Sequence, residues 1–392
     1  ELAPRERANL MQRWADLAGQ HVEQLAREES LVSARLFSET SQVDAPAAVN
    51  WIRYYAEYAD KLDGSITATR PQSLSLVTRE PYGVVGAIAP WNFPLVLAVW
   101  KAAPAMAAGN SVVLKPSELT PYSITRLAAL AVAAGIPPGV FNVVQGDGAT
   151  TGSALVKHPD VSYVAFTGST RTGAQIMSDA AQSGIKPVSL ELGGKSPQLV
   201  FADCGNIKRV AREIAWGITR NSGQLCYAGT RLVVDIQVRD ALLAAIAEQF
   251  EQLVPGPTWE PASTLAPIAS AAQIERIEGL LAQTVAEGAT LAAGGKAFQG
   301  KAGGWFFEPT ILAGLKPGMT GFAEEFFGPI LGVQTFTDAA QGIELAQHPT
   351  YGLAGSVYSQ DMNRALSAAR ALRAGTVWIN SWGRKADMSA PF

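Results

Sequence analysis

The chain has 392 residues, more than the roughly 250–300 at which one hydrophobic core stops growing, so we expect at least two packed domains. Apolar residues make up 48% and charged residues 17%, which excludes a disordered or collagen-like chain. The 31 Lys and Arg residues against 34 Asp and Glu give a net charge of −3, without the basic excess that nucleic-acid binding requires. We therefore expect a globular protein that does not bind nucleic acid.

Two amphipathic helices are predicted first, because apolar residues recur at helical spacing from Leu10 to Leu25 and again from Val49 to Ala59. The segment 74–79 is predicted to be extended, as one arm of a hairpin. Short β-rich runs then alternate with helical segments. The expected strands are 84–89, 111–114, 140–144, 161–166 and 187–192, and the expected helices are 94–108, 121–134, 150–158 and 169–183. This alternation predicts a parallel, doubly wound sheet.

A second series follows the break at Gly193-Gly194. The expected strands are 196–201, 231–234, 307–312, 331–336, 356–358 and 376–380, and the expected helices are 207–219, 237–253, 270–287 and 361–373. This series predicts a second α/β domain. The glycine-rich stretch 300–304 is expected to be a loop.

Cysteines, histidines and apolar runs limit where the protein works. Cys204 and Cys226 are too few for a disulfide framework, so we expect a reducing, cytoplasmic environment. The few scattered histidines and the lack of HExxH or CxxC predict no metal site. The longest uncharged run, 82–100, contains Pro90 and Pro94, which favour a strand, a turn and a helix over a membrane span. The charged first residues do not resemble a signal peptide, and without an initiator Met we expect the start of the protein to be missing.

Two glycine-rich strand-to-helix turns are candidate phosphate sites. Gly146-Asp-Gly-Ala-Thr-Thr-Gly152 is close to the dinucleotide fingerprint GxGxxG, with its third glycine one place late. An ordinary turn explains it equally well. In Phe166-Thr-Gly-Ser-Thr170, Gly168 permits close approach to the backbone and Ser169 can cap a helix beside an anion. A helix cap without a ligand is the alternative.

Two further segments place polar groups at predicted turns. Lys115-Pro-Ser-Glu118 follows a β run, where open α/β folds bind ligands, and its carboxylate could accept hydrogen bonds from ribose hydroxyls. A solvated Lys/Glu loop is the alternative. Pro90-Trp-Asn-Phe-Pro94 surrounds an amide with aromatic rings and prolines. Because buried amides need partners, Asn92 is either an oxyanion donor or a structural amide that ties the turn to the backbone.

Cys226 and Glu191 are the candidate reactive side chains. Cys226 lies in a glycine-flanked loop after a helix, whereas most cysteines outside disulfides are buried filler, the role that fits Cys204. Glu191 ends an apolar strand, where burial would raise its pKa toward the range of a general base. The alternative is a structural carboxylate paired with Lys195 or Lys186.

Six segments together resemble, in order and spacing, the aldehyde dehydrogenase superfamily over nearly the whole chain. They are Pro90-Trp-Asn-Phe-Pro94, Lys115-Pro-Ser-Glu118, Phe166-Thr-Gly-Ser169, Glu191-Leu-Gly-Gly-Lys195, Gly223-Gln-Leu-Cys226 and Glu324-Glu-Phe-Phe-Gly-Pro329. Each is unspecific alone, but the set is highly specific. The last residues, 386–392, resemble the branch that acts on amino- and glutamylamino-aldehydes.

The resemblance implies an α/β fold with three parts. These are a Rossmann-type parallel-sheet NAD-binding domain at 1–62 and 82–193, a small oligomerisation hairpin at 63–81, and a second α/β catalytic domain at 194–392. The family pattern continues past Phe392 with a glycine-rich loop and a strand used in oligomerisation. We therefore expect a homodimer or homotetramer whose closing strand is absent from this chain, and no membrane partner.

The resemblance also implies oxidation of an aldehyde to the carboxylic acid with NAD. Cys226 is then the nucleophile that forms a thiohemiacetal and, after hydride transfer, a thioester. Asn92 and the Cys226 backbone N–H hold the oxyanion. Glu191 activates the water that releases the acid, and Lys101 assists the proton transfers.

Further residues are implied at the cofactor and the substrate. Glu325 and Phe327 position the nicotinamide half, and Ser169 contacts the pyrophosphate. Lys115 and Glu118 contact the adenosine ribose, which implies a preference for NAD over NADP. The set expected at the cofactor is Ile88, Ala89, Pro90, Trp91, Lys115, Ser117, Glu118, Gly148, Phe166, Thr167, Gly168, Ser169, Thr172, Leu192, Gly193, Gln273, Glu325 and Phe327. The set expected at the substrate is Phe93, Leu97, Trp100, Arg220, Leu225 and Tyr227.

The sequence allows more than one substrate and more than one type of reaction. Arg220 stands where many members carry an aromatic residue, and Arg384-Lys385 resemble the mouth lining, so cations there would favour an aldehyde with a distal carboxylate. The aminoaldehyde match points the other way. A cysteine hydrolase or acyltransferase, a silent NAD-binding protein and a CoA-acylating relative are the other functions. A hydrolase or acyltransferase would need a histidine base, and none is evident. A silent NAD-binding protein would not explain the intact Cys226 and Glu191. Glu191 argues against the CoA-acylating relative, because it favours water as the acyl acceptor.

Overall fold

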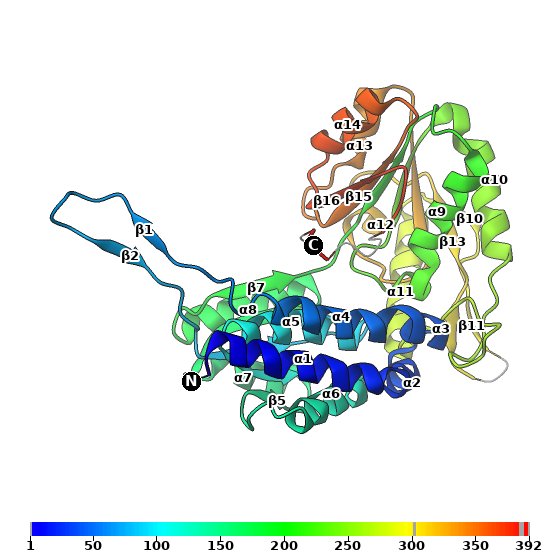
Figure 1. Cartoon of the computed structure of the whole chain (residues 1–392). Coiled ribbons are helices and arrows are strands. Elements are labelled where there is room, and N and C mark those ends of the chain that lie inside the picture. Colours follow the sequence, from blue (N-terminus) through cyan, green and yellow to red (C-terminus); the bar gives the residue numbers. More distant parts are fainter. Residues whose placement is uncertain (1, 301–302, 384–387, 391–392) are drawn as a thin grey trace. The chain divides into compact units, whose positions relative to one another are not determined.

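The computed structural model describes residues 2–300, 303–383 and 388–390. The chain divides after Leu192 into two compact units, called unit 1 (residues 1–192) and unit 2 (residues 193–392). Each unit has its own sheets and its own buried apolar core. Figure 1 shows both units, with many of their helices and strands labelled.

Unit 1 is built on a five-stranded sheet whose paired strands are all parallel. In pairing order the strands are β5 (Phe141–Val143), β4 (Ser111–Lys115), β3 (Val84–Ile88), β6 (Val161–Thr167) and β7 (Val188–Glu191). The chain starts in the middle at β3, moves outward to β5, and returns past β3 to β6. This reversal between β3 and β6 is the topological switch point of a doubly wound fold. The predicted parallel, doubly wound sheet is confirmed.

The helices of unit 1 include both of those predicted at the start of the chain. They are α1 (Pro4–Gln20), α2 (Val22–Ser33), α3 (Phe37–Glu39), α4 (Ala45–Ala56), α5 (Pro94–Ala107), α6 (Tyr122–Ala133), α7 (Ser153–Lys157) and α8 (Thr170–Gln182), with π-helical turns at Thr40–Asp44 and Gly148–Gly152. Trp14 is fully buried on α1, and its indole donates to the Leu127 carbonyl on α6 at 3.0 Å. The helix predicted from Leu10 to Leu25 is interrupted at His21, where the backbone leaves helical geometry.

A hairpin leaves unit 1 between α4 and β3. Strands β1 (Ser65–Thr67) and β2 (Ser75–Val77) pair antiparallel, with Ile66 opposite Leu76. Both side chains are exposed, and Figure 1 shows the hairpin extending away from the rest of its unit. The predicted extended arm at 74–79 is confirmed.

Unit 2 is built on a seven-stranded sheet that is parallel except at one edge. In pairing order its strands are β10 (Thr290–Ala293), β13 (Thr310–Ala313), β14 (Ile330–Phe336), β9 (Arg231–Asp235), β8 (Pro197–Val200), β15 (Ala354–Tyr358) and β16 (Thr376–Ile379), and only β10 runs antiparallel to its neighbour. Its helices are α9 (Ile207–Thr219), α10 (Ile236–Glu251), α11 (Ala271–Ala286), α12 (Thr320–Ala323), α13 (Ala339–Ala346) and α14 (Met362–Ala371). The central strands are buried on both faces, which is why they are mostly apolar. The α/β class of this half is confirmed.

One strand predicted in unit 2 is wrong. The run 307–312 is two strands, because β12 (Trp305–Phe307) pairs with β11 (Ala297–Gln299) in a small antiparallel sheet, whereas β13 joins the large one. Pro309 separates them, since proline has no N–H to donate to a ladder. Strands β10 and β11 and helices α12 and α13 are not predicted by the sequence, because segments this short give no clear hydrophobic period.

Candidate active site

Polar residues singled out in the first half of the sequence gather at one edge of the unit 1 sheet. Asn92 lies in the turn between β3 and α5, Lys115 ends β4, Ser169 follows β6 and Glu191 ends β7. The carboxyl ends of parallel strands meet at the same edge, and ligands bind there in open α/β folds. The fold therefore brings together side chains from four segments that are far apart in the chain.

The turn after β6 presents the N-terminus of α8. Ser169 is the N-cap residue, and its hydroxyl accepts the Thr172 N–H at 3.2 Å. A Cβ at Gly168 would lie 2.4 Å from the Phe166 ring, so only glycine fits. The first N–H groups of a helix lack intrahelical partners and attract anions. These features fit a phosphate group.

The other glycine-rich turn, 146–152, is already capped. The Asp147 carboxylate accepts the Thr150 N–H at 2.7 Å, and this hydrogen bond lowers the pKa of Asp147. The carboxylate thus occupies a helix N-terminus that could otherwise attract a phosphate. A Cβ at Gly148 would meet nothing within 4 Å, so packing does not explain that glycine.

Lys115 and Glu118 form a pair with unequal exposure. The Lys115 side chain is 2% exposed and the Glu118 side chain 57%. The Lys115 ammonium donates to the Pro116 carbonyl at 2.7 Å and to the Glu118 carboxylate at 3.4 Å. The exposed Glu118 carboxylate can accept hydrogen bonds from the hydroxyls of a diol, and the buried Lys115 ammonium balances the negative charge of that carboxylate.

Glu191 faces a lysine that sequence spacing alone does not select. Thr167 lies opposite Glu191 in the register of β6 and β7, and the Lys101 ammonium on α5 donates to the Thr167 hydroxyl at 2.5 Å. Burial raises the pKa of the Glu191 carboxyl, and the charge of Lys101 opposes that shift. Lys186, which belongs to the same unit, donates instead to the Val156 and His158 carbonyls.

In unit 2, Cys226 lies in a loop with unusual backbone geometry. Asn221 and Ser222 have φ of 47° and 51°, a left-handed region that non-glycine residues rarely adopt. The Ser222 and Gln224 side chains hydrogen-bond to backbone groups of residues 266–269, and two of the Gln224 bonds measure 2.9 and 3.1 Å. These bonds hold the loop so that Cys226 is half-buried.

Glycines let two neighbouring loops approach the Cys226 loop. A Cβ at Gly194 would lie 2.3 Å from the Cys226 carbonyl oxygen, and a Cβ at Gly223 would lie 2.2 Å from the Gly328 carbonyl oxygen. Real Cβ atoms do not come this close to backbone. The sequence does not predict this role for the glycines, because their contacts are with residues far along the chain.

Glu325 is half-buried beside Gly194. Its carboxylate accepts the Gly194 N–H at 3.1 Å, and burial raises its pKa to about 7. The Gln273 amide donates to the carbonyls of Phe326 and Phe327, each at 2.9 Å, and so fixes the loop that carries Glu325. Phe327 has a left-handed φ of 53°.

The residues predicted at the substrate divide between the units. Phe93, Leu97 and Trp100 belong to unit 1, and Arg220, Leu225 and Tyr227 belong to unit 2. The Arg220 guanidinium lies 5.2 Å from the centre of the Trp216 ring and donates to the Tyr227 hydroxyl at 3.3 Å. Tyr227 in turn meets Trp378 at 6.1 Å between ring centres. The sequence did not select Trp216 or Trp378, although exposed tryptophans near a candidate site are a usable signal.

The predicted catalytic residues also come from both units, with Asn92 and Glu191 in unit 1 and Cys226 in unit 2. Arg384 and Lys385 lie outside the described residues. Within residues 2–300, 303–383 and 388–390, no helix is long and apolar enough to cross a membrane. In the same part of the chain, no cluster of three or more His, Cys, Asp or Glu side chains could hold a metal ion.

Comparison with known proteins identifies the class. The model of the aldehyde dehydrogenase family matches residues 1–392. The NADP/NAD-dependent aldehyde dehydrogenase PuuC of Escherichia coli is 42% identical over 390 residues, which cover 100% of this chain and 78% of that protein. The aminoacetaldehyde dehydrogenase of Pseudomonas aeruginosa is 41% identical over 389 residues, which cover 99% and 77%. The crystal structure of an indole-3-acetaldehyde dehydrogenase in complex with NAD+ has a TM-score of 0.96 at 43% identity, covering 100% of this chain and 79% of that one.

The chain therefore belongs to the aldehyde dehydrogenase family. The predictions of family, fold class and oxidoreductase activity on aldehydes are confirmed. The roles of individual residues and the domain functions stay predictions.

Proposed function

We propose that this enzyme oxidises its aldehyde through a covalent intermediate on Cys226. The aldehyde dehydrogenase family and the NAD+ complex of a solved relative make NAD the cofactor. The observation that supports the residue roles best is the cluster of Lys101, Thr167 and Glu191, which places a carboxyl of raised pKa beside a proton-carrying side chain.

The reaction begins with the Cys226 thiolate. Its sulfur forms a bond to the carbonyl carbon, and the carbonyl π electrons move to oxygen, which gives a thiohemiacetal oxyanion. The Asn92 amide and the Cys226 backbone N–H donate hydrogen bonds to that oxygen. NAD, when bound, supplies the acceptor for the hydride that leaves the carbon, and Cys226 then carries a thioester.

Glu191 completes the reaction. Its carboxylate removes a proton from water as the water oxygen bonds to the thioester carbon, and the Cys226 thiolate leaves as the carboxylic acid is released. A pKa raised by burial makes Glu191 a stronger base than an exposed carboxylate. Lys101 and Thr167 provide a route for the proton away from Glu191.

The residues present fit NAD. An exposed Glu118 carboxylate with the buried Lys115 ammonium suits the adenosine ribose hydroxyls, and the N-terminus of α8 at Ser169 suits the pyrophosphate. We assign the nicotinamide ribose to Glu325 and the ring to Phe327. The assignment of Gly148 to the cofactor has less support than those of the other residues, because the Asp147 carboxylate already caps that turn.

Two alternatives lose support. A cysteine hydrolase needs a histidine base, but His348 is buried in unit 2, and its ring nitrogens bond to the backbone of Phe322, Thr350 and Tyr351. Burial also lowers the pKa of His348 to about 4. Family membership likewise leaves no support for a silent protein.

The central test uses Cys226→Ala and Glu191→Gln in a stopped-flow assay of NADH formation. Cys226→Ala should abolish oxidation while NAD still binds in a fluorescence titration, because the thiol takes part only in chemistry. Glu191→Gln should release about one NADH per site and then stall, since only deacylation needs the base. Oxidation by Cys226→Ala, or unaltered steady-state turnover by Glu191→Gln, would contradict the respective role.

For the substrate, we propose an amino- or acylamino-aldehyde. The aminoacetaldehyde dehydrogenase among the relatives supports this branch. Of the cations that would favour a distal carboxylate, Arg220 lies against the Trp216 ring and donates to the Tyr227 hydroxyl, and Arg384 and Lys385 lie outside the described residues. The kcat/KM values of an ω-aminoaldehyde, a semialdehyde and a neutral aldehyde of equal length test the choice. A clear preference for the semialdehyde would restore the charge argument.

A further inference from the structure

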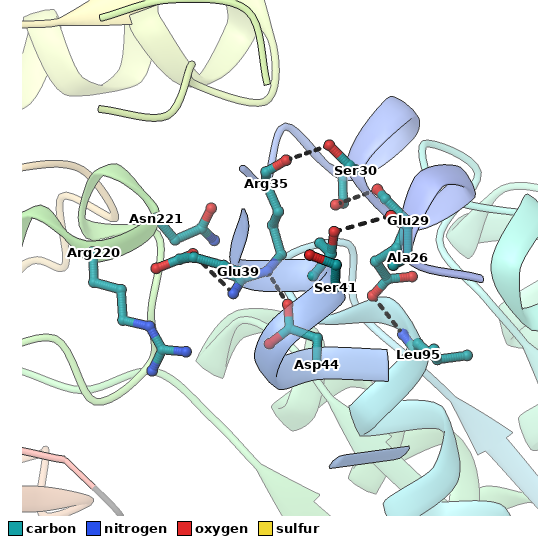
Figure 2. Close-up of polar contacts among 12 residues, drawn as sticks. Ala26, Glu29, Ser30, Arg35, Glu39, Ser41, Asp44, Leu95, Arg220 and Asn221 are labelled. Atoms are coloured by element: carbon teal, nitrogen blue, oxygen red, sulfur yellow. Dashed lines mark hydrogen bonds and ion pairs between the residues drawn. The ribbon is translucent and has the colours of Figure 1, made fainter. Parts of the chain in front are cut away.

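A group of charged side chains is buried in unit 1, outside the residues assigned so far. Glu29 on α2, Arg35 just after that helix and Asp44 at the end of the π-helical turn are each at least 98% buried. Figure 2 shows the polar contacts around Arg35. Charges are costly to bury even when they are paired, and apolar residues of similar size often stabilise a fold as well or better. Stability alone is therefore a weak reason for this group.

Glu29 holds the first turn of α5. Its carboxylate accepts the Leu95 N–H at 2.9 Å, as Figure 2 shows. The same carboxylate accepts the Ser123 hydroxyl at 2.5 Å. Pro94, the first residue of α5, has no N–H, so Leu95 offers the first donor of the helix. Glu29 thus fixes the start of α5 three residues after Asn92.

Arg35 contacts the residue that caps the same helix, Phe93. Its guanidinium lies 4.0 Å from the centre of the Phe93 ring, the residue directly after Asn92. The same guanidinium bonds Asp44 through Nε and lies 3.0 Å from the Glu39 carboxylate, which fixes its plane. A planar group held in this way is a rigid support for an aromatic ring.

The chain segment that carries Arg35 is itself strained. Helix α2 ends at Ser33, and the next residue, Ala34, has a left-handed φ of 60° although it is not glycine. Residues in this conformation cost stability and persist only where the surroundings require them. The turn at Ala34 directs the chain so that Arg35 reaches the Phe93 ring.

These contacts hold the backbone that directly follows Asn92, at Phe93 and at Leu95. We propose that Glu29 and Arg35 are positioning residues that hold the Asn92 amide in the orientation needed for oxyanion stabilisation. The inference rests on the proposed role of Asn92. An oxyanion donor acts only when aimed at the developing charge, and a displacement of about 1 Å can cost roughly 10²-fold in rate.

The test is a double-mutant cycle between Arg35 and Asn92, read as the single-turnover rate of NADH formation. Arg35→Lys keeps a cation beside Asp44, so the protein should fold, but it removes the planar face under Phe93. We expect Arg35→Lys to slow the rate about 10- to 100-fold in the wild-type background, with KM changed less than about twofold. In the Asn92→Ala background the same substitution should cost less than about threefold.

Glu29 provides a second arm with a conservative rescue. Glu29→Ala removes the acceptor for the Leu95 N–H and should slow the rate in the same background-dependent way, whereas Glu29→Gln keeps a carbonyl acceptor and should retain the rate. Glu28→Ala is the matched control, because Glu28 also lies on α2 and pairs with Arg126 at 2.6 Å without contacting the turn. Arg27→Lys is the control for Arg35→Lys, since Arg27 lies 5.1 Å over the Phe37 ring.

The outcomes separate this inference from the mechanism. If Asn92→Ala slows the rate about 10²- to 10³-fold but Arg35→Lys costs nothing, or costs the same factor in both backgrounds, the positioning role is overturned and the role of Asn92 stands. If Asn92→Ala itself costs less than about threefold, the oxyanion assignment fails and this inference fails with it. If Arg35→Lys slows NADH formation only in the background that retains Asn92, the oxyanion role of Asn92 and the positioning role of Arg35 are both supported.

Discussion

Three carboxylates serve three proposed tasks. Glu118 is exposed, Glu191 is half-buried with Lys101 near it, and Glu325 is half-buried and accepts the Gly194 N–H. Burial raises the pKa of Glu191 and of Glu325, the latter to about 7. Exposure suits an acceptor of hydroxyls, partial burial suits a base that must exchange protons with water, and a hydrogen bond to the backbone suits a carboxylate that must stay in one place.

The exposed Glu118 leads to a prediction about cofactor choice. A 2′-phosphate would bring about two negative charges beside this carboxylate and remove a hydroxyl donor. The Lys115 ammonium is held by the Pro116 carbonyl and is buried, so it cannot easily turn to the phosphate. We expect kcat/KM to favour NAD over NADP by about tenfold or more, which corresponds to about 1.4 kcal/mol.

Glu118→Gln should narrow that cofactor ratio, since the amide keeps its size but loses the charge. Lys157→Met, which removes a surface cation of α7 paired with Asp179 at 3.4 Å, is a control that should leave the ratio unchanged. Equal kcat/KM for both cofactors in the wild type would refute the preference. An unaltered ratio in Glu118→Gln would show that the carboxylate is not its cause.

Single residues were predicted best where their chemistry is local. Ser169 was expected to cap a helix and does so, because the cap and the helix are neighbours in sequence. Gly194 and Gln224 were not selected for holding the Cys226 loop, since their contacts join segments distant in the chain. Lys101 was expected to assist Glu191 only from the family resemblance, because the register of β7 with β6, which places Glu191 opposite Thr167, joins segments distant in the chain.

At the scale of elements, the helix contact between α2 and α5 predicts a pH dependence of stability. Burial raises the pKa of Glu29 from 4.5 to about 7, and its hydrogen bonds oppose that shift only in part. Below about pH 4.5 the carboxyl is protonated in both folded and unfolded chains. Between there and pH 7 the unfolded chain ionises while the folded one does not, so stability falls as pH rises.

Glu29→Gln lacks this loss, because the amide does not titrate. Relative to wild type, the variant should gain unfolding free energy as pH rises from about 4.5 to 7, by about 3 kcal/mol at most. Thermal melting at pH 5 and pH 8 measures it. Glu28→Gln is the matched control for removing a carboxylate from the same helix. A constant difference between wild type and Glu29→Gln at both pH values would argue against a buried, titrating Glu29.

Elements with a long period or a full apolar run were predicted well, and short ones were not. Strand β6 and helix α9 match their predicted ranges to within a residue. The run 307–312 was misread because six apolar or turn residues do not reveal that Pro309 sends the two halves into different sheets. Helix α13, with eight residues, is too short for its period to stand out.

At the scale of the whole molecule, the alternation of strands and helices predicted two α/β parts, but their functions came from the family resemblance. Periodicity shows that Glu191 ends a strand and that Cys226 lies in a loop. It does not show that the two act on one carbonyl, because that depends on packing across distant segments. The assignment of NAD binding to 1–62 and 82–193, and of catalysis to 194–392, therefore stays a proposal that rests on the motifs.

The hairpin carries the last prediction, that the protein is a homo-oligomer in which this element is covered by another copy. Ile66 and Leu76 are cross-strand neighbours with 72% and 60% of their surface exposed. A two-stranded hairpin is marginal alone, and apolar side chains on such an arm indicate an interface. Ile66→Asp combined with Leu76→Asp should lower the mass seen in sedimentation equilibrium, while Gln72→Asp at the tip adds charge without removing apolar surface and should not. An unchanged mass in the double variant would show that the arm does not hold the copies together.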